Sequence, residues 1–86
     1  MTTRELELRD TIISIVRDKI KAELKNISEK KTAPIKICEL ISNLENEYYE
    51  MKSDISKQCN FSEEQVSNTI DDGFNFLWKN FTQTIH

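Results

Sequence analysis

Apolar residues recur at helical spacing in three segments of the chain, and polar residues fill most of the positions between them. In the first segment, the apolar residues follow one another at steps of three, four and seven. This spacing is typical of one face of an amphipathic helix. It predicts a helix over residues 4–27. The apolar face of that helix consists of Leu6, Ile13, Val16, Ile20, Leu24 and Ile27, with Leu8 and Ile12 at its edge.

The second segment has the most regular spacing, with alternating steps of four and three residues. Such a stripe favours a straight helix that lies lengthwise against its neighbours, and we predict it over residues 34–59. The third segment predicts a helix over residues 62–82. The second apolar face is Ile37, Ile41, Leu44, Tyr48, Met51, Ile55 and Cys59, and the third is Val66, Ile70, Phe74, Leu77 and Phe81, with Trp78 at its margin.

The first connection between helices is predicted over residues 28–34, which show no apolar period. Pro34 disfavours helix in the residue before it, but it fits the first turn of the following helix. Thr32 is of the residue type that caps a helix N-terminus. We therefore expect Thr32 to cap the second helix.

The second connection carries the clearest start signal in the chain. Ser62 and Gln65 have the spacing of a capping box, and Phe61 and Val66 occupy the two positions of a hydrophobic staple. Asn60 tolerates the left-handed conformation that ends a helix. The whole pattern predicts an all-α fold, a compact three-helix domain formed by residues 1–86.

Composition limits the chemistry of this chain. Its 86 residues include one Gly and one Pro, so it lacks the repeated glycines of a P-loop or of a dinucleotide-binding turn. The turns of an all-β fold would also need more residues of this kind. The net charge is -3, but it is unevenly distributed: residues 17–36 carry seven basic and three acidic side chains, whereas residues 37–86 carry three basic and nine acidic ones.

The two cysteines, the lack of a signal peptide and the lack of a long apolar run predict a soluble protein of the cytoplasm or another reducing compartment, with no membrane segment. In a straight second helix, Cys38 and Cys59 would lie about 30 Å apart, which excludes a disulfide between them. Both are interpreted as small buried apolar residues.

Catalytic and metal-binding patterns are not evident. The single histidine, His86, is the last residue, and no second imidazole is present to share a metal. The acidic residues Glu47, Glu50 and Asp54 share one helical face, which we interpret as solvated rather than as a cation site or an acid–base pair. We expect no cofactor, no metal and no enzymatic activity.

The segment from Asp54 to Ile70 resembles a helix-turn-helix motif, and the resemblance continues to residue 77. An apolar and a small residue precede the turn, Asn marks the turn, and apolar residues follow it. The matching residues are Ile55, Ser56, Asn60, Phe61 and Val66. The resemblance implies a DNA-binding transcription regulator that directs Gln65, Ser67 and Asn68 toward base edges and places Lys57 on a phosphate.

An ordinary corner between two helices would produce the same pattern. The helix after the turn carries four carboxylates and no basic residue before Lys79, whereas DNA readers add several Lys or Arg contacts to phosphate. The carboxylates are Glu63, Glu64, Asp71 and Asp72. Steeply crossed helices would favour the motif, and a long antiparallel hairpin would favour a bundle.

Two aromatic residues do not fit the predicted apolar faces. Phe76 lies about 200° around the helix from Phe74, and Tyr49 directly follows the inward-facing Tyr48. Phe76 is either covered by the N-terminal segment, half exposed, or part of a docking surface that Gly73 lets a partner approach closely. The predicted partner-binding residues are Tyr49, Phe76, Glu47, Glu50 and Asp54.

We therefore predict a small acidic helical regulatory or adaptor protein that acts by binding another protein and inhibits or modulates it. A second copy of the chain is a further candidate partner, since a core of this size gains from additional burial. The alternative is the helix-turn-helix DNA-binding regulator described above.

Overall fold

The chain folds into helices joined by short connections. The computed structural model describes residues 2–28 and 31–85, with side chains up to residue 81. The described part is all-helical and holds four helices, where three are predicted: α1 (Thr3–Asn26), α2 (Ala33–Glu50), α3 (Lys52–Cys59) and α4 (Glu63–Ile85). In the predicted first connection, Glu29 and Lys30 lie outside the described residues, as does His86.

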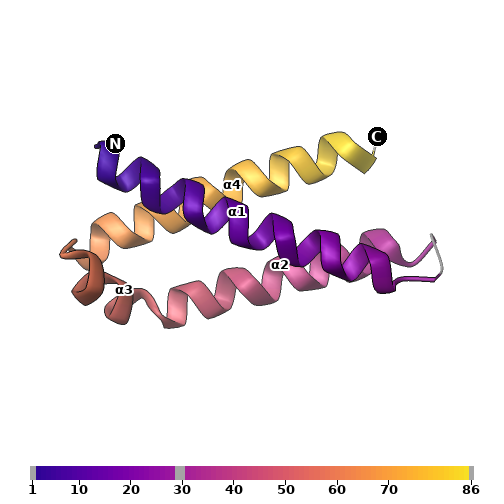
Figure 1. The fold of residues 1–86 in the computed structure, drawn as a ribbon, viewed down its shortest axis with the longest axis horizontal. Helices are drawn as coiled ribbons and strands as arrows, with labels where there is room; N and C mark the ends of the chain where they lie inside the picture. The colour runs from indigo at the N-terminus through magenta and orange to yellow at the C-terminus, as the bar shows by residue number, and fades with distance from the viewer. Residues whose placement is uncertain (1, 29–30, 86) are drawn as a thin grey trace.

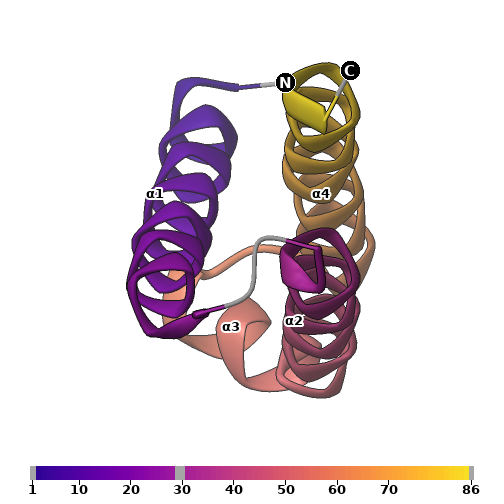
Figure 2. The ribbon, with the colours of Figure 1, turned by 90° about the vertical axis from the view of Figure 1, so that its right-hand side faces the viewer.

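The three long helices form an elongated bundle. In Figure 1, α1 and α4 run in the same general direction and cross, and α2 runs back beneath them. The molecule measures 43 × 21 × 16 Å and has a radius of gyration of 13.9 Å, compared with about 12 Å for a compact domain of this length. Figure 2 shows α3 lying across one end of the bundle instead of alongside α2.

The core lies where α1, α2 and α4 meet. The rings of Tyr48 and Phe74 pack against each other there, with centroids 5.8 Å apart and planes inclined by 59°. The apolar face predicted for the third helix is confirmed, because its members are buried or packed against the core. The buried apolar residues are Ile12, Ile13, Val16, Ile37, Ile41, Leu44, Val66, Ile70, Phe74 and Leu77.

Two residues of the apolar face predicted for the first helix are exposed, although Ile20 and Ile27 of that face pack against the core. Leu6 is 36% exposed and Leu24 is 49% exposed, whereas Ile12, predicted at the edge of the face, is 1% exposed. The reason is the crossing of α1 and α4. Two crossing helices bury the residues nearest the crossing point most completely, so some residues of a lengthwise stripe lie outside the contact.

The prediction of one straight helix over residues 34–59 is wrong, because the helix bends at Met51. Met51 has φ -86° and ψ 2°, and the backbone ladder crosses the bend through bonds from Met51 N–H to Glu47 O (3.0 Å) and from Ile55 N–H to Met51 O (2.9 Å). The bend directs α3 across the end of the bundle, where Ile55 packs against the core. Met51 itself is left 43% exposed.

The corner before α4 agrees with its prediction in detail. Asn60 is left-handed, with φ 57° and ψ 41°. The N–H of Gln65 donates to Ser62 Oγ at 3.1 Å, and the N–H of Ser62 donates to Gln65 Oε1 at 2.8 Å, which completes the capping box. Phe61 packs against the core, in which Val66 is fully buried. The last helix extends to Ile85, three residues beyond its predicted end.

The starts of α1 and α2 differ from expectation. Thr32 does not make the predicted capping bond, because its backbone is already right-handed (φ -92°, ψ -10°), while Pro34 does lie in the first turn. A capping box opens α1 instead: Glu5 N–H donates to Thr2 Oγ1 at 3.3 Å, and Thr2 N–H donates to Glu5 Oε1 at 3.4 Å. Its spacing is readable in the sequence but was not among the predictions.

Candidate functional site

The close contact of α1 with α4 occurs at Gly73. A Cβ atom on this buried residue would lie 3.6 Å from Arg9 Cγ and 3.8 Å from Ile12 Cγ2. Gly73 is therefore covered by α1 of the same chain, at distances that a Cβ would meet in ordinary van der Waals contact. This corrects the expectation that Gly73 lets an external partner approach Phe76 closely.

Arg9 connects the two helices beside this contact. Its Nη1 lies 3.1 Å from Asp72 Oδ2 on α4, and its Nη2 lies 3.1 Å from Asp10 Oδ1. The hydrogen bond to Asp72, followed by that to Asp10, raises the pKa of Arg9 above its usual value. The charge of this guanidinium is therefore already balanced within the chain.

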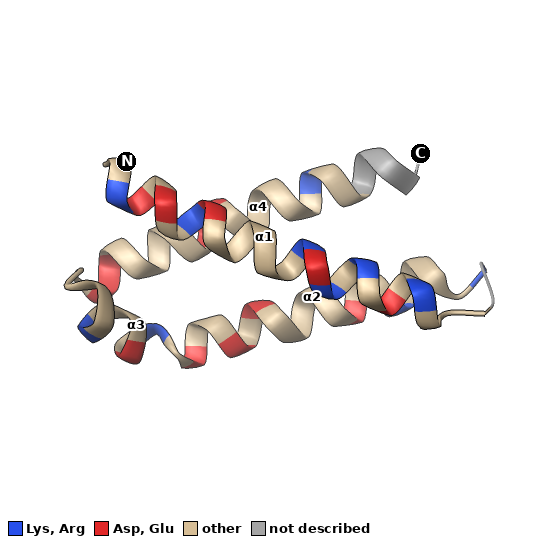
Figure 3. Cartoon of the chain, viewed as in Figure 1, with Lys and Arg blue, Asp and Glu red and all other residues tan. Residues whose placement is uncertain are grey.

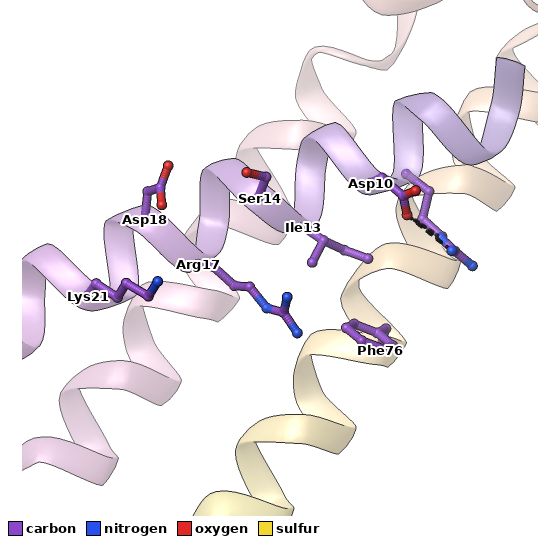
Figure 4. Close-up of a pocket in the computed structure, with 8 residues that line it drawn as sticks. Asp10, Ile13, Ser14, Arg17, Asp18, Lys21 and Phe76 are labelled. Carbon is purple, nitrogen blue, oxygen red and sulfur yellow. Dashed lines mark hydrogen bonds and ion pairs between the residues drawn. The ribbon is translucent and has the colours of Figure 1, made fainter.

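Beyond the crossing, α1 and α4 diverge, and a groove of about 340 Å³ lies between them. Figure 4 shows the Arg17 side chain extending from α1 toward Phe76 on α4. The Arg17 guanidinium carbon lies 5.3 Å from the centre of the Phe76 ring, within the range of a cation–π interaction. The groove is lined by Ile13, Ser14, Arg17, Asp18, Lys21 and Phe76, with the Arg9–Asp10 pair completing its lining.

Two cations of this groove, Arg17 and Lys21, form no ion pair within the described chain. Among the described residues, neither Arg17 nor Lys21 has a carboxylate within ion-pair distance. Phe76 beneath Arg17 is still 42% exposed. The groove thus presents an aromatic ring together with two unpaired positive charges, and Asp18 is the carboxylate beside them. Figure 3 shows basic positions recurring along the half of α1 nearer its C-terminus.

The predicted acidic residues lie around the bend at Met51. Glu47 and Glu50 are exposed in the last turn of α2, and Asp54 is exposed in the first turn of α3. The backbone bonds from Met51 N–H to Glu47 O and from Ile55 N–H to Met51 O continue the helical ladder between these residues. In the described structure none of the three carboxylates forms an ion pair. We call Glu47, Glu50, Met51 and Asp54 the acidic knob; Figure 3 shows acidic positions along this edge of α2 and α3.

Phe76 and the other predicted partner-binding residues lie on different surfaces. Phe74 faces α2 through Tyr48, and Phe76 lies far around α4 from Phe74, toward α1. Tyr49 is half-buried on α2 and packs against the core. The structure thus places the acidic residues around the bend between α2 and α3, and it places Phe76 in the separate groove.

The helix-turn-helix candidates surround the corner between α3 and α4, which Figure 2 shows at the end of the bundle. Lys57 and Asn68 are exposed, and Ser67 is half-buried. The Gln65 side chain accepts a bond in the capping box, so its carbonyl oxygen is already engaged. The neighbouring Glu63, Glu64 and Asp71 are exposed, and Asp72 is paired with Arg9.

Arg4 of α1 contacts the corner between α3 and α4. Its Nη2 donates to the Cys59 carbonyl oxygen at 2.9 Å, and its guanidinium carbon lies 5.2 Å from the centre of the Phe61 ring. A second hollow of about 340 Å³ lies here, lined in part by Leu8 and Gln58. Cys59 and Cys38 are both free and half-buried, so they are less buried than expected.

The roles of Arg4 and Arg17 were not predicted, because a long side chain can reach an aromatic ring that is distant in sequence without leaving a periodic signal.

No group of three His, Cys, Asp or Glu side chains in the described residues is arranged to hold a metal ion. No described helix is both long and apolar enough to cross a membrane. Comparison with family models, curated proteins and solved structures finds no match to this chain.

Proposed function

We propose that this chain is a small helical regulatory or adaptor protein, not an enzyme, and that it acts by binding another protein, which it inhibits or modulates. The observation that carries the proposal is Phe76, which is 42% exposed beneath the guanidinium of Arg17. Aromatic residues and arginine are the types enriched at the centres of protein interfaces. Because Arg17 and Lys21 form no ion pair within the described residues, the groove suits a partner surface that carries carboxylates.

The acidic knob supports a second binding surface on the same chain. Met51 is 43% exposed among three carboxylates that form no ion pair in the described structure, although Lys52 directly follows Met51 in the sequence. Methionine adapts its shape to different contacts, and an acidic rim steers basic or cationic surfaces toward it. An adaptor needs two such surfaces of different chemistry, and the groove and the acidic knob meet that need.

The free thiols of Cys38 and Cys59 support a reducing compartment such as the cytoplasm as the site of action. A protein that works there binds its partner in the presence of many competing surfaces. We therefore expect binding to depend on charge placement as well as on apolar contact.

The experiment that tests this function is capture from extracts of the cells that make the protein. Immobilised wild-type chain is compared with Arg17→Glu, and with Lys36→Glu, which makes the same charge change at an exposed position of α2 outside the groove. A protein retained by the wild type and by Lys36→Glu but lost from Arg17→Glu is the expected result. Equal retention by all three chains would contradict a role for the groove.

DNA binding is the second candidate function, and the corner favours it. An eight-residue helix, a left-handed Asn60 and a three-residue turn lead into α4, and α3 lies across the bundle instead of forming a hairpin. The exposed carboxylates at the start of α4 oppose it, because they repel phosphate. A random duplex at low salt is the test. Retention that Lys57→Glu weakens would support DNA binding, and no retention would exclude it.

A further inference from the structure

The groove and the acidic knob are two unsatisfied surfaces of opposite charge on one chain. The groove holds Arg17, Lys21 and the exposed part of the Phe76 ring. The acidic knob holds three carboxylates around the exposed thioether of Met51. Among the described residues, no ion pair involves the two cations or the three carboxylates. The groove thus offers positive charges that form no ion pair, and the acidic knob offers negative charges that form none.

The two surfaces also match in chemistry. A thioether packs favourably at the edge of an aromatic ring, and Met51 is the exposed apolar side chain of the acidic knob, as Phe76 is of the groove. A guanidinium binds a carboxylate through paired N–H donors, and the ammonium of Lys21 offers a second positive charge nearby. The groove volume of about 340 Å³ is within the size range of pockets that enclose a ligand, so it can admit an anchoring side chain.

The surface area that the chain exposes to solvent is large enough for a contact with a second copy. The chain exposes 5982 Å², whereas a compact monomer of 10.1 kDa is expected to expose about 5300 Å². The excess is comparable to the ~800 Å² that each partner of a standard interface buries. A second copy docked on this elongated chain would remove that excess from water.

We infer that the groove of one copy binds the acidic knob of a second copy, with Met51 of one chain against Phe76 of the other. The inference rests on the proposed function, since it names the occupant of the same groove. The two surfaces come from different helices: the groove lies between α1 and α4, and the acidic knob lies where α2 meets α3. The contact is therefore head to tail, and the assembly either closes into a ring or continues as a chain of copies.

The test is sedimentation equilibrium of the purified full chain over a wide range of concentrations. The wild type is expected to show an average mass above the monomer that rises with concentration. Arg17→Glu places a carboxylate against the acidic knob, and Glu50→Lys places an ammonium against the groove. Each variant alone is expected to associate at least about tenfold more weakly.

The decisive sample is an equal mixture of these two variants. Glu50→Lys retains an intact groove for the intact acidic knob of Arg17→Glu, and the two substituted side chains carry opposite charges. Association is therefore expected to return in the mixture. The matched controls are Lys36→Glu and Glu39→Lys, which make the same changes at exposed positions of α2 outside both surfaces and are expected to associate like the wild type.

A wild-type chain that remains monomeric at every concentration overturns the inference. So does association that neither charge reversal weakens, or that does not return in the mixture. These outcomes are separate from failure of the proposed function. If the purified chain is monomeric but Arg17→Glu still loses a cellular partner, the groove binds another protein and only the self-association is wrong. Circular dichroism of each variant shows that the helices are retained.

Discussion

Arg17 and Phe76 meet across the groove, with the guanidinium carbon 5.3 Å from the ring centre, and they join α1 to α4 beyond the crossing of these helices at Gly73. The ring is thereby covered on one side by its own chain and remains accessible on the other. The sequence left open whether Phe76 is covered by the N-terminal segment or half exposed. In the structure the ring is partly covered by α1 and partly exposed. It also directs a positive charge to the one place in the groove where an aromatic surface is accessible.

Removal of the Arg17 guanidinium is expected to lower the free energy of unfolding by about 0.5–1 kcal/mol, the usual size of an exposed cation–π contact. Urea denaturation of Arg17→Ala, Phe76→Leu and the double variant measures it as a coupling between the two residues. Phe76→Asp is expected to leave the helix content unchanged, because the ring is 42% exposed. Additive losses in the double variant would show that the two side chains do not interact.

Gly73→Ala is expected to stabilise the protein. Glycine inside a helix costs about 0.5–1 kcal/mol relative to alanine, and the added Cβ would meet its neighbours at 3.6 Å or more, which is ordinary contact. Gly73→Leu is the contrasting variant, since a larger side chain must displace α1 and is expected to cost about 1–3 kcal/mol. Thermal denaturation of both variants tests the contact. A loss of stability with alanine would mean that α1 lies closer than described.

Asn60→Ala is expected to destabilise the corner between α3 and α4 by about 1 kcal/mol, because a side chain with a Cβ and no local hydrogen bond disfavours the left-handed region. Asn60→Gly is the matched control and is expected to be tolerated, since glycine adopts φ 57° without strain. Urea denaturation compares the two. Equal stability of both variants would indicate that Asn60 leaves the left-handed conformation in solution.

Alkaline pH is expected to destabilise the protein through Tyr48. Burial, followed by the charge of Glu47, raises the pKa of Tyr48 above its ordinary value of 10.0. The folded state thus favours the neutral phenol, and this contribution is complete below pH 10 and is lost as the pH rises through the raised pKa. In urea denaturation at pH 9 to 11, Tyr48→Phe should lose less stability than the wild type. Tyr49→Phe is the control, and it should follow the wild type because it keeps Tyr48.

The sequence predicted those features of the fold that depend on residues close to one another in the chain. The left-handed Asn60, the Ser62–Gln65 capping box and the buried face of α4 all agree with the sequence, because a cap is formed by neighbouring residues and a buried face follows helical spacing. The position of Phe76 off that face was predictable for the same reason. The partner that covers it was not, since Arg17 belongs to another helix.

The bend at Met51 shows where periodicity is not sufficient. The apolar stripe continues at steps of four and three through the bend, and the backbone of Met51 departs only moderately from helical geometry. Nothing in the spacing marks a break. Past the bend Ile55 packs against the core, and Met51 at the bend is left exposed.

The sequence by itself determined that this chain is helical, which residues of α4 face inward, and where the corner before α4 lies, because these properties depend on residues within a few positions of one another. Only the tertiary structure decided that α1 crosses α4 at Gly73, that the middle helix divides into α2 and α3, and that Arg17 reaches Phe76. Those features depend on how whole helices cross and pack, and the crossing point selects which part of each apolar stripe is removed from water.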